Sequence, residues 1–233
     1  MKNIIRNVSH LQDRNGIKYE VNSEKPFTGI LVKKYKNGQK EVGENYRNGE
    51  LDGLETYWYE NGQKRVESNN KNGKTDGLVT RWWENGQKEL EGNYKDGKED
   101  GLWTYWYENG QKKFEGNYKD GYEDGLETEW YDNGQKNWEK NHKDRRLEGL
   151  ETEWYEDGQK KFERNYKDGK IDGLYTEWYE NGQKELEGNY KDGKEDGNWT
   201  YWSEEGDFAT TETWKDGEGE EDSVVNRLKK KFL

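Results

Sequence analysis

The chain has 233 residues and carries 39 Lys+Arg against 51 Asp+Glu, so its formal charge is −12. Leu, Ile, Val and Phe together supply only 32 residues, a content typical of disordered chains. The 12 Trp and 17 Tyr argue against disorder, because aromatic side chains bury large areas. The acidic charge argues against nucleic acid or an anionic membrane as the partner.

Other absences restrict the chemistry further. Cysteine is absent, which excludes a cysteine nucleophile and thiolate metal sites. His10 and His142 are the two histidines, too few for a histidine-rich metal site. We expect no transmembrane helix, because no apolar stretch approaches about 18 residues. The N-terminus has no apolar core of a signal peptide, so the chain as numbered is expected in the cytoplasm. A signal removed before this numbering begins is the alternative.

Residues 1–28 are predicted to form an N-terminal cap and a lead-in strand. Asn15-Gly16 indicates a turn that lies outside the frame of the later repeats. The segment Pro26-Phe27-Thr28-Gly29 then leads into a regular repeat.

Residues 29–217 contain eight tandem units with a step of 24 residues. The motif Asn-Gly-Gln-Lys recurs in register, with Asp157 replacing its Asn in one unit. A second glycine lies between consecutive units, and Arg145 replaces it once. The motif begins at Asn37, Asn61, Asn85, Asn109, Asn133 and Asn181. A constant step predicts units stacked in one geometry.

Each unit is predicted to be a β-hairpin. In residues 101–118, an aromatic and Thr-rich strand precedes Asn109-Gly110, a strong hairpin signal. The hydrophobic pattern favours a three-residue loop, 108–110, with Gly110 left-handed and a bulge at this glycine. That loop places Trp106 opposite Lys112 and Thr104 opposite Phe114. Residues 119–124 are predicted to be a polar loop to the next unit.

This register predicts four ladders on one face of the sheet. The structural ladder is Trp58, Trp82, Trp106, Trp130, Trp154, Trp178 and Trp202. A threonine ladder runs Thr56, Thr80, Thr104, Thr128, Thr152, Thr176 and Thr200. A mixed apolar ladder runs Val42, Val66, Leu90, Phe114, Trp138, Phe162 and Leu186. The fourth is Tyr46, Tyr94, Tyr118, Tyr166 and Tyr190, with Asn70 and His142 substituting.

The opposite face is predicted to carry an exposed aromatic row. Its members are Tyr35, Tyr59, Trp83, Tyr107, Tyr131, Tyr155 and Tyr179. The predicted fold is all-β, an elongated and twisted single-layer antiparallel sheet. Residues 218–233 are predicted to be an acidic linker and a short C-terminal helix over Ser223–Leu233 that caps the last strand edge. A basic membrane anchor is the alternative for this helix.

The repeated unit resembles the bacterial MORN-repeat variant, over roughly residues 17–217. The pattern Asp-Gly-Leu-x-Thr-x-Trp-Tyr-Glu-Asn-Gly-Gln-Lys, with Asn-Tyr-Lys-Asp-Gly between units, carries the resemblance. The resemblance implies a sheet of hairpin repeats and a non-enzymatic binding role. Many members of this family carry the label of antitoxin in toxin–antitoxin systems.

Two sets of aromatic residues are candidate sites. The Trp ladder is interpreted as the core of the sheet, with a platform for glycans, peptides or bases as the alternative. Tyr59, Trp83, Tyr107, Tyr131, Tyr155 and Tyr179 are the candidate contact surface. The loops 96–100 and 192–196 are interpreted as polar turns, with Ca²⁺ binding as the alternative. We expect no catalytic residue, metal or cofactor.

The favoured hypothesis is a non-enzymatic repeat scaffold that binds another protein, such as a basic toxin. An acidic surface accelerates encounter with a basic partner. The alternative is a glycan- or cell-surface-binding module that uses the aromatic side chains. The sequence does not determine the oligomeric state.

Overall fold

The computed structural model describes residues 7–219, and the chain divides into two compact units. Unit 1 comprises 1–112 and 117–122, and unit 2 comprises 113–116 and 123–233. Each is an open antiparallel sheet of β-hairpins, so the predicted all-β class is confirmed. The helix expected over Ser223–Leu233 lies outside the described residues. Among residues 7–219, no helix is long and apolar enough to cross a membrane.

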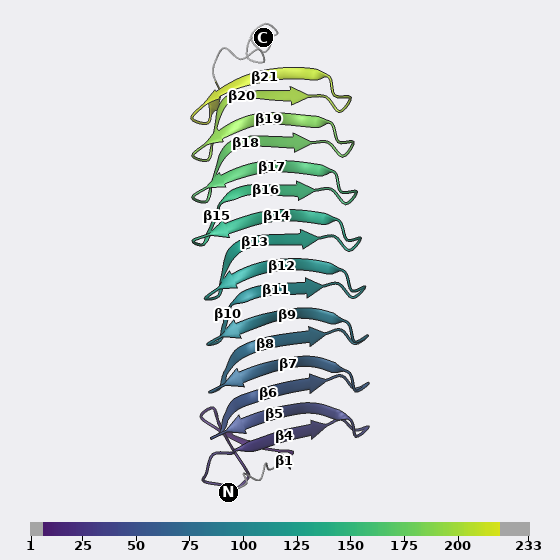
Figure 1. Cartoon of the computed structure of the whole chain (residues 1–233), viewed down its shortest axis with the longest axis vertical. Helices are drawn as coiled ribbons and strands as arrows, with labels where there is room; N and C mark the ends of the chain where they lie inside the picture. The colour runs from purple at the N-terminus through teal and green to yellow at the C-terminus, as the bar shows by residue number, and fades with distance from the viewer. Residues whose placement is uncertain (1–6, 220–233) are drawn as a thin grey trace, which may run out of the picture. The chain divides into compact units, whose positions relative to one another are not determined.

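In unit 1, consecutive strands from β4 onward pair in chain order (Figure 1). The strands are β1 (Asn7–Val8), β2 (Gln12–Arg14), β3 (Ile17–Tyr19), β4 (Gly29–Lys34), β5 (Lys40–Arg47), β6 (Glu50–Trp58), β7 (Lys64–Lys71), β8 (Lys74–Trp82), β9 (Lys88–Lys95), β10 (Lys98–Glu99) and β11 (Gly101–Trp106).

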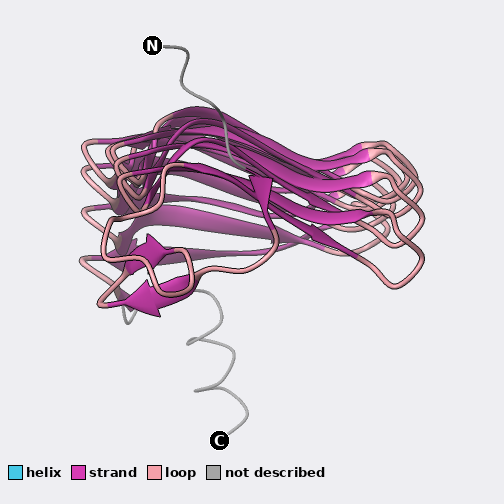
Figure 2. Cartoon of the chain, turned by 90° about the horizontal axis from the view of Figure 1, so that it is seen from below, coloured by secondary structure: helices cyan, strands magenta, loops and turns pink. Residues whose placement is uncertain are grey.

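Unit 2 repeats the same pattern of pairing. Its strands are β13 (Tyr122–Trp130), β14 (Lys136–Lys143), β15 (Arg146–Leu147), β16 (Gly149–Trp154), β17 (Lys160–Lys167), β18 (Lys170–Trp178), β19 (Lys184–Lys191), β20 (Lys194–Trp202), β21 (Phe208–Lys215) and β22 (Glu218–Gly219). Strand β12 (Lys112–Lys119) and β13 include residues of both units. Loops join the strands at their two ends (Figure 2).

The three-residue hairpin loop is confirmed. In the hairpin β16–β17, the Tyr155 N–H donates to the Gln159 carbonyl (2.8 Å) and the Gly158 N–H donates to the Tyr155 carbonyl (2.9 Å). Gly158 has φ of 87°, the left-handed region where glycine has no steric penalty. The Asp157 carboxylate accepts from the Gln159 N–H at 2.9 Å, which fixes the loop further. The Asn or Asp of the motif therefore has a structural role in the turn.

The polar loops between consecutive 24-residue repeats are two-residue hairpin turns. In the first, Asn48 and Gly49 have φ of 50° and 83°, and Arg47 lies opposite Glu50. Two consecutive positive φ values define a type I′ turn, which matches the twist of the flanking strands. Asp144 and Arg145 adopt the same geometry with φ of 51° and 64°. Arg145 is therefore a bulky residue in a left-handed conformation.

A β-bulge beyond each three-residue loop corrects the predicted register. In the hairpin β16–β17, Trp154 lies opposite Lys160, as the equivalent prediction for Trp106 and Lys112 requires. Glu153 then lies opposite Phe162, so Lys161 is an extra residue on the return strand. Thr152 consequently lies opposite Glu163. The prediction that places each Thr opposite the apolar ladder is wrong, because it omits this extra residue.

The four predicted ladders therefore lie on two faces. We call the face of the Trp and Thr ladders the Trp–Thr face. The mixed apolar ladder and the Tyr ladder lie on the other, which we call the Val–Phe face. In the sheet of either unit, both faces thus bury aromatic side chains. The same register recurs in β13–β14 and β18–β19.

Two tryptophans on the Val–Phe face pack over glycines. Trp199 is 3% exposed and makes an edge contact with Tyr190, with ring centroids 5.1 Å apart. A Cβ at Gly188 would lie 2.1 Å from the Trp199 ring, so only glycine fits beneath it. Trp103 lies over Gly92 with the same spacing of 2.1 Å. The indole ring replaces the missing side chain of the neighbouring strand.

The N-terminal segment covers the first strand of unit 1. Strand β1 pairs in parallel with β4, with Val8 opposite Leu31. Phe27, Leu31 and Tyr46 form a buried cluster against which Val8 packs. Burial of this cluster shields an otherwise open sheet edge, which is an aggregation hazard. The boundaries 1–28, 29–217 and 218–233 stay a prediction.

Replacing Arg145 by glycine is expected to stabilise the protein. The substitution removes a left-handed penalty of about 1–2 kcal/mol, less the entropy gained by the unfolded chain. We expect a net gain of about 1 kcal/mol, measured from the midpoint of urea unfolding. Arg145→Ala keeps the backbone penalty and is the control. An equal gain in both variants would show that the backbone conformation is not the cause.

The variant Gly188→Ala is expected to destabilise the protein by about 1–3 kcal/mol, because the added methyl displaces the Trp199 ring. Urea unfolding measures the loss. Ser68 occupies the equivalent position beside Val79, where a side chain is accommodated. Ser68→Ala should cost about 1 kcal/mol or less, from its lost hydrogen bond to Glu55. Similar losses in the two variants would contradict the packing role of Gly188.

Candidate functional site

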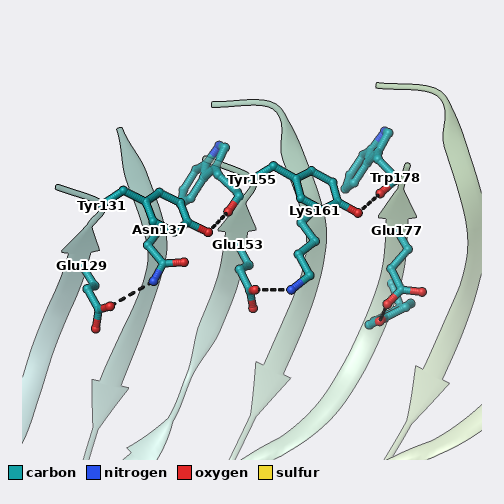
Figure 3. Close-up of polar contacts among 10 residues, drawn as sticks. Glu129, Tyr131, Asn137, Glu153, Tyr155, Lys161, Glu177 and Trp178 are labelled. Carbon is teal, nitrogen blue, oxygen red and sulfur yellow. Dashed lines mark hydrogen bonds and ion pairs between the residues drawn. The ribbon is translucent and has the colours of Figure 1, made fainter. Parts of the chain in front are cut away.

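The predicted aromatic row is half-buried and its polar atoms are bonded within the sheet. Tyr131 and Tyr155 donate their hydroxyls to the carbonyls of Trp154 and Trp178, each at 2.8 Å (Figure 3). Trp83 does the same in unit 1 through its indole N–H, at 3.3 Å from the Trp106 carbonyl. The same bond forms from Tyr35, Tyr59 and Tyr179. These residues fasten each hairpin to the next, and their role in binding stays a prediction.

Charged side chains lie beside this row on the Val–Phe face. Lys161, the extra residue of its bulge, pairs with Glu153 at 2.6 Å (Figure 3). Asn137, at the equivalent position, donates to Glu129 at 2.9 Å. The hydrogen bond with Glu153 raises the pKa of Lys161. The bulge therefore places a polar group above the row, which reduces the ring area open to a ligand.

The Trp ladder is also half-buried, and lysines cover its rings. In unit 2, Lys136 Nζ lies 5.3 Å from the Trp154 ring centroid. The same ammonium pairs with Glu139 at 2.5 Å. Glu139 in turn accepts from the Thr128 hydroxyl at 3.3 Å. A Trp–Lys–Glu–Thr network of this kind recurs between hairpins within each unit, and cation–π attraction of about 0.5–1 kcal/mol per pair stabilises it.

A row of exposed leucines lies on the same Trp–Thr face. They precede the Thr ladder by two residues, and the sequence analysis did not identify them as a site. Leu54, Leu78 and Leu102 belong to unit 1, and Leu126, Leu150 and Leu174 belong to unit 2. Their exposed fractions lie between 41% and 51%. The 24-residue step of Asp-Gly-Leu is the signal that could have indicated this row.

The repeat that contains Arg145, residues 125–148, buries a carboxylate on the Val–Phe face. Glu127 is 3% exposed, and its Oε2 lies 3.5 Å from Lys140 Nζ and 3.7 Å from His142 Nδ1. Its Oε1 has no hydrogen-bond partner in the described structure. Burial raises the pKa of Glu127, while Lys140 and His142 act to lower it. The Glu123 carboxylate adds to the increase.

Within residues 7–219, no group of three or more His, Asp or Glu side chains could hold a metal ion. Asp96 and Gly97 of the predicted polar turn have φ of 51° and 81°, a type I′ geometry. Asp192 and Gly193 have φ of 52° and 87°. These two loops are hairpin turns.

Stability should fall as pH rises because of Glu127. A carboxyl with a raised folded pKa contributes most stability below its unfolded pKa of about 4.5, and this contribution is lost as pH rises through the folded pKa. The free energy of unfolding of the parent protein minus that of Glu127→Gln should therefore decrease between about pH 4 and about pH 8. Urea unfolding at each pH measures it.

The exposed Glu60→Gln variant, at a residue that does not contribute to the pKa shift of Glu127, controls for the change in net charge. A difference that stays constant or increases with pH would contradict the raised pKa of Glu127.

Comparison with protein families identifies the repeat. Five segments match the MORN repeat variant, at residues 51–72, 75–96, 99–120, 147–168 and 171–192. The search of curated proteins gave no match. Residues 121–146 lie between matched segments, and β13–β14 within them keeps the register of the other hairpins. MORN repeats in general are non-catalytic scaffolds that bind proteins or membranes. Five segments of the chain are therefore similar to the MORN repeat variant, and the hairpins follow one structural pattern in each unit.

Proposed function

We propose that this protein is a non-enzymatic scaffold that binds a protein partner through the Trp–Thr face. The observation that carries the proposal is the row of exposed leucines. Soluble proteins rarely repeat exposed large apolar side chains along one line unless the surface is covered by a partner. Three leucines in each unit are half-exposed on this face.

The surroundings of the leucines favour protein over glycan. Glycans bind to open aromatic rings, whereas the Trp rings here carry lysine ammonium groups at 5.3–5.7 Å. The rings of the tyrosine row are half-buried, with their hydroxyls bonded to neighbouring strands. Leucine side chains contribute apolar area and have no hydrogen-bonding group, which suits contact with an apolar protein surface.

The charge favours a basic partner. The formal charge of −12 is carried mainly by the later repeats, with a net −4 over residues 173–196 and −6 over residues 197–220, so an oppositely charged protein is attracted to them at long range. More specifically, we propose that the partner is a basic toxin and that the chain is its antitoxin. The resemblance of the repeats to antitoxin-labelled proteins supports this form. The predicted row Tyr59, Trp83, Tyr107, Tyr131, Tyr155 and Tyr179 is the rival contact surface.

Substitution of the leucines is expected to weaken partner binding. The chain is immobilised, partners are captured from the native host, and the affinity of the purified partner is measured by calorimetry. Leu78→Ser/Leu102→Ser should lower the affinity at least about tenfold, because each buried leucine contributes about 1–2 kcal/mol. Higher salt should also weaken binding to a basic partner.

The control is Val21→Ser, which removes an aliphatic side chain of 51% exposure outside the row. Tyr131→Ala and Tyr155→Ala test the rival surface. Partner binding that depends on the tyrosines but not on the leucines would move the site to the Val–Phe face. If no captured protein depends on either set, the scaffold proposal is wrong. For the antitoxin form, the captured partner must arrest growth when expressed alone.

A further inference from the structure

The Trp–Thr face of unit 1 is hollowed beside its first hairpin. A groove of about 1070 Å³ lies among β1, β4, β5, β6 and β7, with Lys64 and Glu67 of β7 in its lining. Its size is at the upper end of ligand sites, which span about 300–1,000 Å³. Strand β1 lies next to β4 in this part of the chain (Figure 1). The groove shares Leu54 with the leucine row and differs from it in that most of its lining comes from the first hairpin and its neighbours.

The first hairpin departs from the repeat at the positions that line the groove. Lys34 stands where the next unit has Trp58, and Gly43 stands where it has Glu67. A Cβ at Gly43 would lie 3.1 Å from the Trp58 ring, so the indole lies against the glycine backbone and forms an aromatic wall of the groove. Val32 replaces the buried threonine. The Trp–Lys–Glu–Thr network is therefore incomplete here, and a cavity remains in its place.

The same departures leave two lysines without a carboxylate partner, and the Lys40 ammonium lies 5.4 Å from the centroid of the Trp58 ring. In the following hairpins the equivalent lysine pairs with a glutamate, as Lys64 does with Glu67 at 2.5 Å. Lys40 has Gly43 at that position, and no carboxylate of residues 7–219 pairs with Lys40 or Lys34. These two lysines lie opposite each other in the register. On an acidic chain, this pair of cations is a local exception.

Charge and apolar surface lie at opposite ends of the groove. Lys34 and Lys40 lie at the loop end of the hairpin. Val32 and Ile30 follow along the same face of β4, and Ser9, which follows β1, lines the far end. From Lys34 to Ile30 the strand spans about 13 Å. Leu54, with 41% of its surface exposed, lines the groove from β6.

We propose that this groove binds an elongated apolar molecule that ends in a carboxylate, as a medium-chain fatty acid does. The carboxylate lies between the ammonium groups of Lys34 and Lys40, where it replaces the glutamate of the regular repeat. The apolar chain lies along Val32 and Ile30 toward the end of the groove at Ser9. Apolar burial provides most of the affinity, and the two lysines set the direction of the ligand. This activity goes beyond the proposed binding of a protein partner and does not depend on it.

The test is calorimetric titration of the full chain with dodecanoate below its micelle concentration. We expect one molecule bound per chain. Dodecyltrimethylammonium has the same chain with the opposite charge and should not bind. Acetate has the charge without the chain and should not bind either. Absence of dodecanoate binding, or equal binding of the cationic analogue, would overturn the proposal.

Two variants locate the site. Gly43→Glu restores the residue of the repeat, which fills the groove and pairs with Lys40, so dodecanoate affinity should fall at least tenfold. Lys34→Gln/Lys40→Gln should have the same effect without adding volume, and it keeps the test valid if Gly43→Glu does not fold. Lys36→Gln/Lys74→Gln removes the same charge from exposed positions and should bind as the parent does. Undiminished binding by both groove variants would refute the assigned site.

Discussion

The extra residue on each return strand determines which side chains can pack together. At this bulge the return strand has one residue more than its partner. Every side chain beyond the bulge on the return strand therefore lies on the opposite face from the one it would occupy without it. Without the bulge, the Trp and Phe ladders share a face and leave the other face polar. With it, each face of a unit carries its own aromatic ladder. A chain with few aliphatic residues can therefore bury apolar surface on both sides of a sheet.

Much of this fold could be predicted from the sequence. The 24-residue step, the hairpins and the left-handed glycine of the three-residue loop all depend on local signals, namely Asn-Gly and alternating strand residues. The bulge could not be predicted, because Lys161 and its equivalents have no turn residue to mark them. Pairing between strands decides their position. Complementary substitutions, such as Gly188 beneath Trp199 or Lys140 beside Glu127, also become visible only once the register is known.

The candidate sites also differ in how readily the sequence reveals them. Aromatic residues are the repeated feature that the sequence makes visible, but the conspicuous tyrosines are used to join hairpins through hydroxyl bonds. The less conspicuous leucines of Asp-Gly-Leu are the side chains left exposed on the Trp–Thr face. In a repeat, residues that complete a network are structural, and positions that break it or remain outside it are free to bind. The leucine row and the groove of the first hairpin are these two cases.

Disulfide trapping tests the bulge most directly, because the chain has no cysteine of its own. The double variant Thr152→Cys/Glu163→Cys joins residues that lie opposite each other, at about 4.5–5.5 Å between Cα atoms. Thr152→Cys/Phe162→Cys joins residues that are opposite only if the bulge is absent. Mass spectrometry after mild oxidation measures the cross-link. The account predicts a disulfide in the first variant and none in the second, and the reverse result would contradict it.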